Sequence, residues 1–234
     1  MTPTLFGSRL SPFVEKVVRA LALKDMHFTL VEPKSPADFK RWNPQTGKMP
    51  VLELDGERVW DSTRILARLD ALRPDRPLYD PDPAVAARQR FLEDWSDESL
   101  YWYVMGLRWN ETNAAASAAQ VAASLPVPAV VRTAIRPILH WQIGGQAKAQ
   151  GLQRLPLTVL VEELGRRFDE LLVWLGDRPF LFAERPSGAD LAIFGQLSTL
   201  RSGPTPQGAA LVDARPALGA WMSRVAQETP VRTD

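Results

Sequence analysis

Short apolar runs alternate with stretches of helical periodicity over the first part of the chain. Four runs have strand-like composition, at residues 4–7, 27–31, 51–54 and 57–60. Between them, apolar residues recur at helical spacing from Pro12 to about Lys24 and from Ser62 to about Leu72. Pro12 suits the first turn of a helix, where its missing N–H is not needed. The pattern predicts an α/β unit.

The last two runs are joined by Asp55-Gly56. This dipeptide suits a type I′ turn, which needs positive φ at both central residues. We therefore predict an antiparallel hairpin there, whereas the first two strands, joined by a helix, are expected to be parallel with a right-handed crossover.

After residue 73 the pattern becomes helical throughout. Four prolines lie between residues 73 and 83 and indicate a linker. Helices are expected at 84–108, at 130–142 with a kink at Pro137, at 157–175, from Ser187, and at 218–227. Ser187 followed by Asp190 resembles a capping box. We predict two domains, residues 1–77 and 84–234, the second all-helical.

Composition removes several classes of function. The net charge of +1 provides no bulk field for nucleic acid or an anionic membrane, and no run of about 20 apolar residues could span a bilayer. The chain has no cysteine, which excludes disulfides and protein-borne thiol chemistry. Neither His27 nor His140 has metal-ligand spacing, so no metal is expected. The start has no secretory signal pattern, and we expect a cytoplasmic protein.

Ser11 stands directly before Pro12, at a helix start. Its hydroxyl is either an ordinary N-cap or a hydrogen-bond donor to an anion held in the positive field of the helix N-terminus. A thiolate is such an anion, because this field lowers the pKa of a thiol. No histidine or acid partner marks Ser11 as a protease-type nucleophile.

Two further segments have the same double interpretation. Met49-Pro50 either ends a loop or, if its peptide bond is cis, offers the Met49 backbone to an extended peptide. Asp61 or Ser62 caps the next helix, and this helix start could also hold a carboxylate at Ser62 and an ammonium group at Asp61.

In combination, these segments resemble the cytosolic glutathione transferase family. The resemblance is carried by Ser11-Pro12-Phe13, by Lys48-Met49-Pro50-Val51-Leu52, by Asp61-Ser62-Thr63-Arg64-Ile65-Leu66, and by Pro179-Phe180-Leu181-Phe182 with Ser187-Gly188-Ala189-Asp190. It covers both predicted domains in order. It implies an α/β thioredoxin-like N-terminal domain, an all-α C-terminal domain and glutathione as co-substrate.

The resemblance also implies roles for individual residues. Pro50 would be the family's cis-proline and Met49 would pair by its backbone with the cysteinyl part of glutathione. Asp61 and Ser62 would hold the γ-glutamyl end. Lys48 is the first candidate to meet the glycyl carboxylate, and Lys34 and Lys40 are the alternatives. Ser187 and Asp190 would form a folding cap.

Ser11 matches the serine-type members, whose hydroxyl donates to the glutathione sulfur, and Ser8 is the alternative hydroxyl. Members with cysteine at this position perform thiol exchange through it, and the absence of cysteine from this chain disfavours that activity. The class stays open between bacterial-like, tau-like and theta-like members. The segment from Ala114 to Gln153 lies where the family builds part of its electrophile pocket. We predict that Trp102, Tyr103 and Trp109 line this apolar pocket, and the alternative is that these aromatics belong to a helix core.

The resulting hypothesis is a detoxifying transferase in which Ser11 stabilises the glutathione thiolate for attack on a hydrophobic electrophile. Two alternatives stay open: a non-catalytic binding or scaffold protein on the same fold, and a glutathione-dependent isomerase or dehalogenase. By resemblance we also expect a homodimer.

Overall fold

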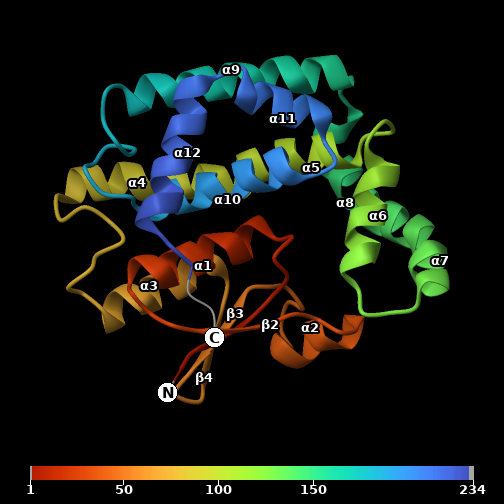
Figure 1. Cartoon of the computed structure of the whole chain (residues 1–234), viewed down its shortest axis with the longest axis horizontal. Coiled ribbons are helices and arrows are strands. Elements are labelled where there is room, and N and C mark those ends of the chain that lie inside the picture. The colour runs from red at the N-terminus through yellow and green to blue at the C-terminus, as the bar shows by residue number, and fades with distance from the viewer. Residues whose placement is uncertain (1, 232–234) are drawn as a thin grey trace.

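A four-stranded sheet underlies the N-terminal part of the chain (Figure 1). A computed structural model describes residues 2–231. The strands are β1 (Thr4–Phe6), β2 (Thr29–Val31), β3 (Val51–Leu54) and β4 (Glu57–Trp60), in the order β2-β1-β3-β4. β1 and β2 are parallel, and the β3–β4 hairpin is antiparallel, which confirms both predictions. Asp55 and Gly56 have φ of 51° and 82° at the turn.

Three helices accompany the sheet: α1 (Pro12–Leu23), α2 (Pro36–Trp42) and α3 (Ser62–Leu72). α1 forms where apolar residues recur at helical spacing, and its buried face includes Val14, Val17 and Leu21. α2 packs onto β1 through Trp42, whose ring lies 5.0 Å from that of Phe6.

The rest of the chain is helical. Its α-helices are α4 (Pro83–Trp95), α5 (Tyr101–Trp109), α6 (Ala114–Ser124), α7 (Ala129–Leu139), α8 (Gly145–Gln150), α9 (Leu157–Leu175), α10 (Gly188–Ser202), α11 (Pro206–Asp213) and α12 (Pro216–Glu228). Two π-helical segments, η1 (Ser96–Leu100) and η2 (His140–Gly144), and a 3₁₀ turn, η3 (Leu152–Arg154), link some of them. This confirms the predicted fold class. The exact domain boundaries stay a prediction.

The helical region differs from the prediction in its details. The helix expected over 84–108 is divided by the π-helical turn η1. Pro137 lies inside α7, and the π-helical η2 follows directly after it. The short helices α8 and α11 were not predicted, because segments of this length contain too few turns to show a periodic apolar stripe.

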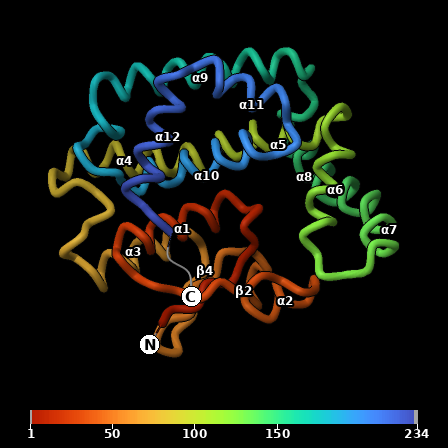
Figure 2. Tube along the Cα trace, viewed as in Figure 1, coloured from red at the N-terminus to blue at the C-terminus, as the bar shows by residue number. Residues whose placement is uncertain are grey.

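The two parts of the chain meet where α1 lies against α10 (Figures 1 and 2). The contact depends on Gly195, because a Cβ there would come within 2.4 Å of the Pro12 carbonyl oxygen. Val14, Val17 and Leu21 of α1 and Ile193 and Leu197 of α10 belong to one continuous core. The N-terminal end of α1, capped by Ser11, is thus held in place by the N-terminal part of the chain and by α10.

Asp190 organises the start of α10 and confirms the predicted capping box. Its carboxylate accepts hydrogen bonds from Ser187 N at 2.9 Å, Ser187 Oγ at 2.8 Å, Leu181 N at 3.0 Å and Trp221 Nε1 at 3.0 Å. Asp190 is fully buried, and this burial raises its pKa while the hydrogen bonds oppose the rise.

Asp190→Ala should lower the free energy of unfolding by about 3–5 kcal/mol, because several buried donors lose their acceptor at once. Ser187→Ala removes only the hydroxyl and should cost about 1–2 kcal/mol. Urea unfolding of both variants measures the difference. Equal losses would mean that Asp190 acts only as an ordinary cap.

Candidate functional site

The register of the sheet brings three segments predicted from the sequence to the same end of the strands, where β1 and β4 finish and β3 begins. Phe6 pairs with Val51, and Val51 pairs with Trp60. Ser11 follows the end of β1, Met49-Pro50 precedes β3, and Asp61-Ser62 follows β4. Because β3 runs antiparallel to both neighbours, its beginning lies beside their ends. The sheet therefore brings together segments that are as far apart in the sequence as Ser11 and Ser62.

Ser11 is the N-cap of α1. Its backbone is extended, with φ −90° and ψ 124°, and its Oγ accepts a hydrogen bond from Val14 N at 3.4 Å. Within the part of the chain that the structure describes, no acceptor is present for the hydroxyl hydrogen, so it remains free to donate. Ser8 Oγ accepts from Leu10 N at 3.3 Å but lies in the loop before the helix. Ser11 is the serine at the positive end of the α1 dipole.

Asp61 is the N-cap of α3, which settles the alternative between it and Ser62. Its Oδ1 accepts from Thr63 N at 3.1 Å and from Arg64 N at 3.2 Å. Its φ of 78° is rare for a residue with a Cβ, a kind of backbone strain that collects at functional sites. Ser62 follows as the first helical residue and is buried.

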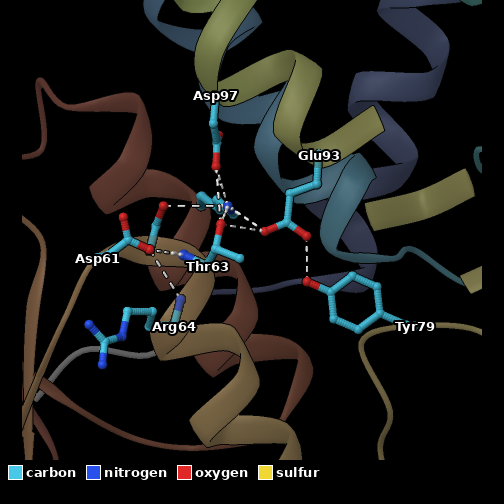
Figure 3. A network of polar contacts seen from close by, with 8 residues as sticks. Asp61, Thr63, Arg64, Tyr79, Glu93 and Asp97 are labelled. Atoms are coloured by element: carbon cyan, nitrogen blue, oxygen red, sulfur yellow. Dashed lines mark hydrogen bonds and ion pairs between the residues drawn. The ribbon is translucent and has the colours of Figure 1, made fainter. Parts of the chain in front are cut away.

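A buried ammonium group that the sequence pattern did not reveal, that of Lys16, contacts the Ser62 hydroxyl. Figure 3 shows the Thr63, Glu93 and Asp97 side chains, which also contact this ammonium group. Lys16 Nζ lies 2.6 Å from Glu93 Oε1 and 2.6 Å from Asp97 Oδ2. It also donates to Ser62 Oγ at 3.4 Å and to Thr63 Oγ1 at 3.1 Å. We call this group, with Tyr79, the Lys16 network. It joins α1 and α3 to α4 and η1.

The network shifts the acidity of its members. Burial lowers the pKa of Lys16, but Asp97 and Glu93 outweigh this and hold it above its ordinary value. Burial raises the pKa of Asp97 to about 6, although the Lys16 ammonium opposes the rise. Tyr79 donates its hydroxyl to Glu93, and burial beside that carboxylate raises the pKa of the phenol. The ammonium therefore stays charged at neutral pH.

The predicted ligand residues Lys48, Met49 and Pro50 directly precede β3. The Met49-Pro50 peptide bond is cis, as the resemblance implies. Pro50 is buried and Met49 half-buried, while Lys48 is exposed. Lys34 and Lys40 are exposed as well.

The three aromatic residues predicted to line an electrophile pocket have different surroundings. Tyr103 belongs to the main core and donates its hydroxyl to Glu163 Oε2 at 2.5 Å. Trp109 is buried in a second apolar cluster and borders an open groove of 1250 Å³ that also includes Trp141. Trp102 is half-buried against Tyr101, with ring centres 5.1 Å apart. The aromatic contact beside Ser11 is instead Phe13 against Tyr101, at 5.0 Å.

A cavity of 220 Å³ borders the segment around Ser11 and is lined by Arg9, Leu10, Glu15, Arg108, Gln120 and Thr199, among others. We call it the arginine cavity. None of Trp102, Tyr103 and Trp109 lines it. Periodicity placed those aromatics on a helix but could not say which face of α5 turns toward α1.

Models of known protein families match both parts of the chain. The N-terminal domain model of glutathione S-transferases matches residues 5–77, and the C-terminal domain model matches residues 139–228. The chain belongs to the glutathione S-transferase family. The prediction of a glutathione transferase is thus confirmed at the level of the family, and the class within it stays open.

Two curated glutathione transferases are similar in sequence. Glutathione transferase GST 23 of Zea mays is 35% identical over 105 residues, which are 42% of this chain and 47% of the maize protein, so that match spans about half of the relative's length. Isoprene-epoxide–glutathione S-transferase of Rhodococcus sp. (strain AD45) is 24% identical over 94% of this chain and 92% of its own length.

Several solved structures share the fold. The β-etherase LigF of Sphingobium sp. strain SYK-6 superimposes with a TM-score of 0.70 at 24% identity, covering 97% of this chain and 95% of LigF. The tau-class enzyme of mango, Mangifera indica, gives a TM-score of 0.65 at 21% identity, covering 98% and 93%. At this identity the likeness concerns the fold alone.

Two further observations concern residues 2–231. No helix there is long and apolar enough to cross a membrane. No group of three or more acidic or histidine side chains is placed to hold a metal ion. The homodimer and the cytoplasmic location stay predictions.

Lys16→Met should lower the free energy of unfolding by about 3–5 kcal/mol near neutral pH, because it leaves buried carboxylates without their cation. Without the ammonium, burial and the neighbouring Glu93 carboxylate raise the pKa of Asp97 unopposed, so the Asp97 carboxylate binds its proton more tightly in the folded state than in the unfolded state. Lowering the pH from about 8 to about 5.5 crosses the region where Asp97 already titrates and protonates the carboxylate that lost its cation. The difference in free energy of unfolding between Lys16→Met and wild type should therefore become smaller.

Urea unfolding at both pH values measures this dependence. Lys148→Met, at an exposed position, is the matched control and should have little effect at either pH. A loss that stays constant across this range would contradict the assignment of the Lys16 network as an ionic cluster.

Proposed function

We propose that this transferase binds glutathione along the edge formed by Ser11, Met49-Pro50 and Asp61-Ser62 and directs its thiolate at an electrophile. The observation that carries the proposal is the strand register, which brings two helix N-termini and the β3 entry to one edge. A tripeptide with a thiol in the middle and a carboxylate at each end is matched to such an arrangement.

At the thiol, the Ser11 hydroxyl would donate to the sulfur. Its oxygen already accepts the Val14 N–H, which leaves the hydroxyl hydrogen for the ligand. The helix dipole and this donor both favour the thiolate over the thiol, so the thiol pKa falls toward neutrality. The nucleophile therefore arrives with the ligand, and the protein supplies its charge stabilisation and its position.

At the γ-glutamyl end, the α-carboxylate would meet the backbone N–H and hydroxyl of Ser62 at the start of α3. The Lys16 ammonium lies behind this hydroxyl, 3.4 Å from Ser62 Oγ, and favours a negative charge there. Asp61, which is exposed at the helix start, would take the α-ammonium group. Lys48 would meet the glycyl carboxylate, since its exposed side chain belongs to the segment that enters β3.

Ser11→Ala should lower kcat/KM for glutathione conjugation to a chlorodinitrobenzene by roughly 100-fold, because the thiolate loses a positioned donor. The KM for glutathione should change little, and the apparent thiol pKa from the pH–rate profile should rise. The variant should stay folded, since loss of the N-cap costs only about 1 kcal/mol.

Two companion variants test the choice of serine. Ser11→Thr keeps a hydroxyl and should recover much of the activity, while Ser8→Ala should remain close to wild type. If Ser8→Ala loses activity and Ser11→Ala does not, Ser8 is the donor.

Ser62→Ala should raise the KM for glutathione about tenfold through loss of hydrogen bonds to a charged group. Cysteinylglycine lacks the γ-glutamyl group, so its KM should be the same in the variant and in wild type. Steady-state kinetics with both thiols measure the difference, and equal effects on the two would place the γ-glutamyl group elsewhere.

A further inference from the structure

The arginine cavity borders the chain on both sides of Ser11, the residue at which we place the thiolate. Arg9 and Leu10 line it from before Ser11, and Glu15 and Arg19 line it from α1. The remainder of its wall comes from α5, α6 and α10. Its volume of 220 Å³ is below the usual range for a whole drug-sized ligand, but it is sufficient for one polar end of a substrate. A molecule that reacts at the Ser11 position could extend one substituent into it.

Arg108, on α5, is the buried charge in this wall. Its side chain is enclosed, with the residue only 6% exposed, and Nη2 donates to Gln120 Oε1 at 2.7 Å. Its Nε is buried and has no acceptor. Among the described residues no carboxylate forms an ion pair with Arg108. Burial lowers the pKa of Arg108, yet a guanidinium remains protonated in proteins.

A buried cation without an anion is costly, so natural structures nearly always give it a partner. The other charges of the cavity do not provide one. Glu15 forms an ion pair with Arg19 at 2.7 Å, and Arg9 is exposed and adds further positive charge. Three arginines thus face a single glutamate that is already paired. The cavity has the electrostatics of a site for an anion.

We propose that Arg108 determines specificity for electrophiles that carry a carboxylate, with the carboxylate in the arginine cavity and the reacting carbon toward the thiol at Ser11. The planar guanidinium still has its Nε–H and further N–H groups to donate, a geometry that fits the two oxygens of a carboxylate. This inference rests on the proposed function for its reaction, but the binding of the anion can be measured without any turnover.

The binding test uses two unreactive compounds of the same shape, a dinitrobenzoate and the matching dinitrobenzamide. Calorimetric titration of wild type should give at least tenfold tighter binding of the benzoate, because only the benzoate forms charge-assisted hydrogen bonds with the guanidinium. In Arg108→Met the preference should disappear through loss of benzoate binding alone. Equal affinities in wild type, or a parallel loss of both compounds in the variant, would overturn the proposal.

The kinetic test uses the corresponding chloro compounds. The glutathione sulfur forms a bond to the ring carbon that bears chlorine, and chloride leaves with the bonding electrons. With rates divided by the uncatalysed rate for each compound, Arg108→Met should lower kcat/KM at least tenfold for the chlorodinitrobenzoate and less than threefold for the amide, mainly through KM. Equal losses for the two compounds would again overturn the proposal.

Two controls separate anion binding from folding. Arg108→Met should unfold at least as late as wild type on heating, because it removes an unpaired buried charge. Arg167→Met alters a half-buried arginine that lies over the Tyr103 ring and does not line the cavity, and this variant should keep the benzoate preference. A protein that keeps an Arg108-dependent preference for benzoate but conjugates neither compound would contradict the proposed function and retain the anion site.

Discussion

The Lys16 network is the interaction on which the arrangement of the site most depends. A buried ammonium needs compensating anions, and here both carboxylates come from the helical layer, at Glu93 and Asp97. The hydroxyls that complete its surroundings, from Ser62 and Thr63, come from the first turn of α3. A single charge therefore fixes the distance between α1, α3 and the α4–η1 segment. The proposed γ-glutamyl position is set by the same contact.

Two helix N-termini then make the electrostatic potential of the site positive. Ser11 begins α1 and Asp61 caps α3, and the register of β1, β3 and β4 holds both at one edge of the sheet. Helix starts expose N–H groups and a partial positive charge, which suits anionic groups of a ligand. The protein needs no reactive side chain of its own for this role, in agreement with the absence of cysteine. What it supplies is charge stabilisation at fixed positions.

Arg108 extends the same principle to the second substrate. The Lys16 ammonium has its anions within the fold, whereas the Arg108 guanidinium has none among the described residues and lines a cavity beside Ser11. Two buried cations with such different surroundings serve different purposes. The first holds the layers together, and we assign the second to an anion that comes from outside. The free energy needed to bury the unpaired Arg108 guanidinium is then offset when a carboxylate binds.

The sequence by itself determined the features that depend on neighbouring residues: the caps at Ser11 and Ser187, the Asp55-Gly56 turn, and the family that these motifs together indicate. Such features are local, because a turn or a cap is decided within a few positions. Only the tertiary structure decided the partners of Lys16 and Arg108, and which aromatic side chains lie beside Ser11. Helical periodicity shows that a side chain lies on a buried face but not what it meets there. The partners come from elements that are distant in the sequence. For a buried charge they determine whether it stabilises the fold or is available to bind a ligand.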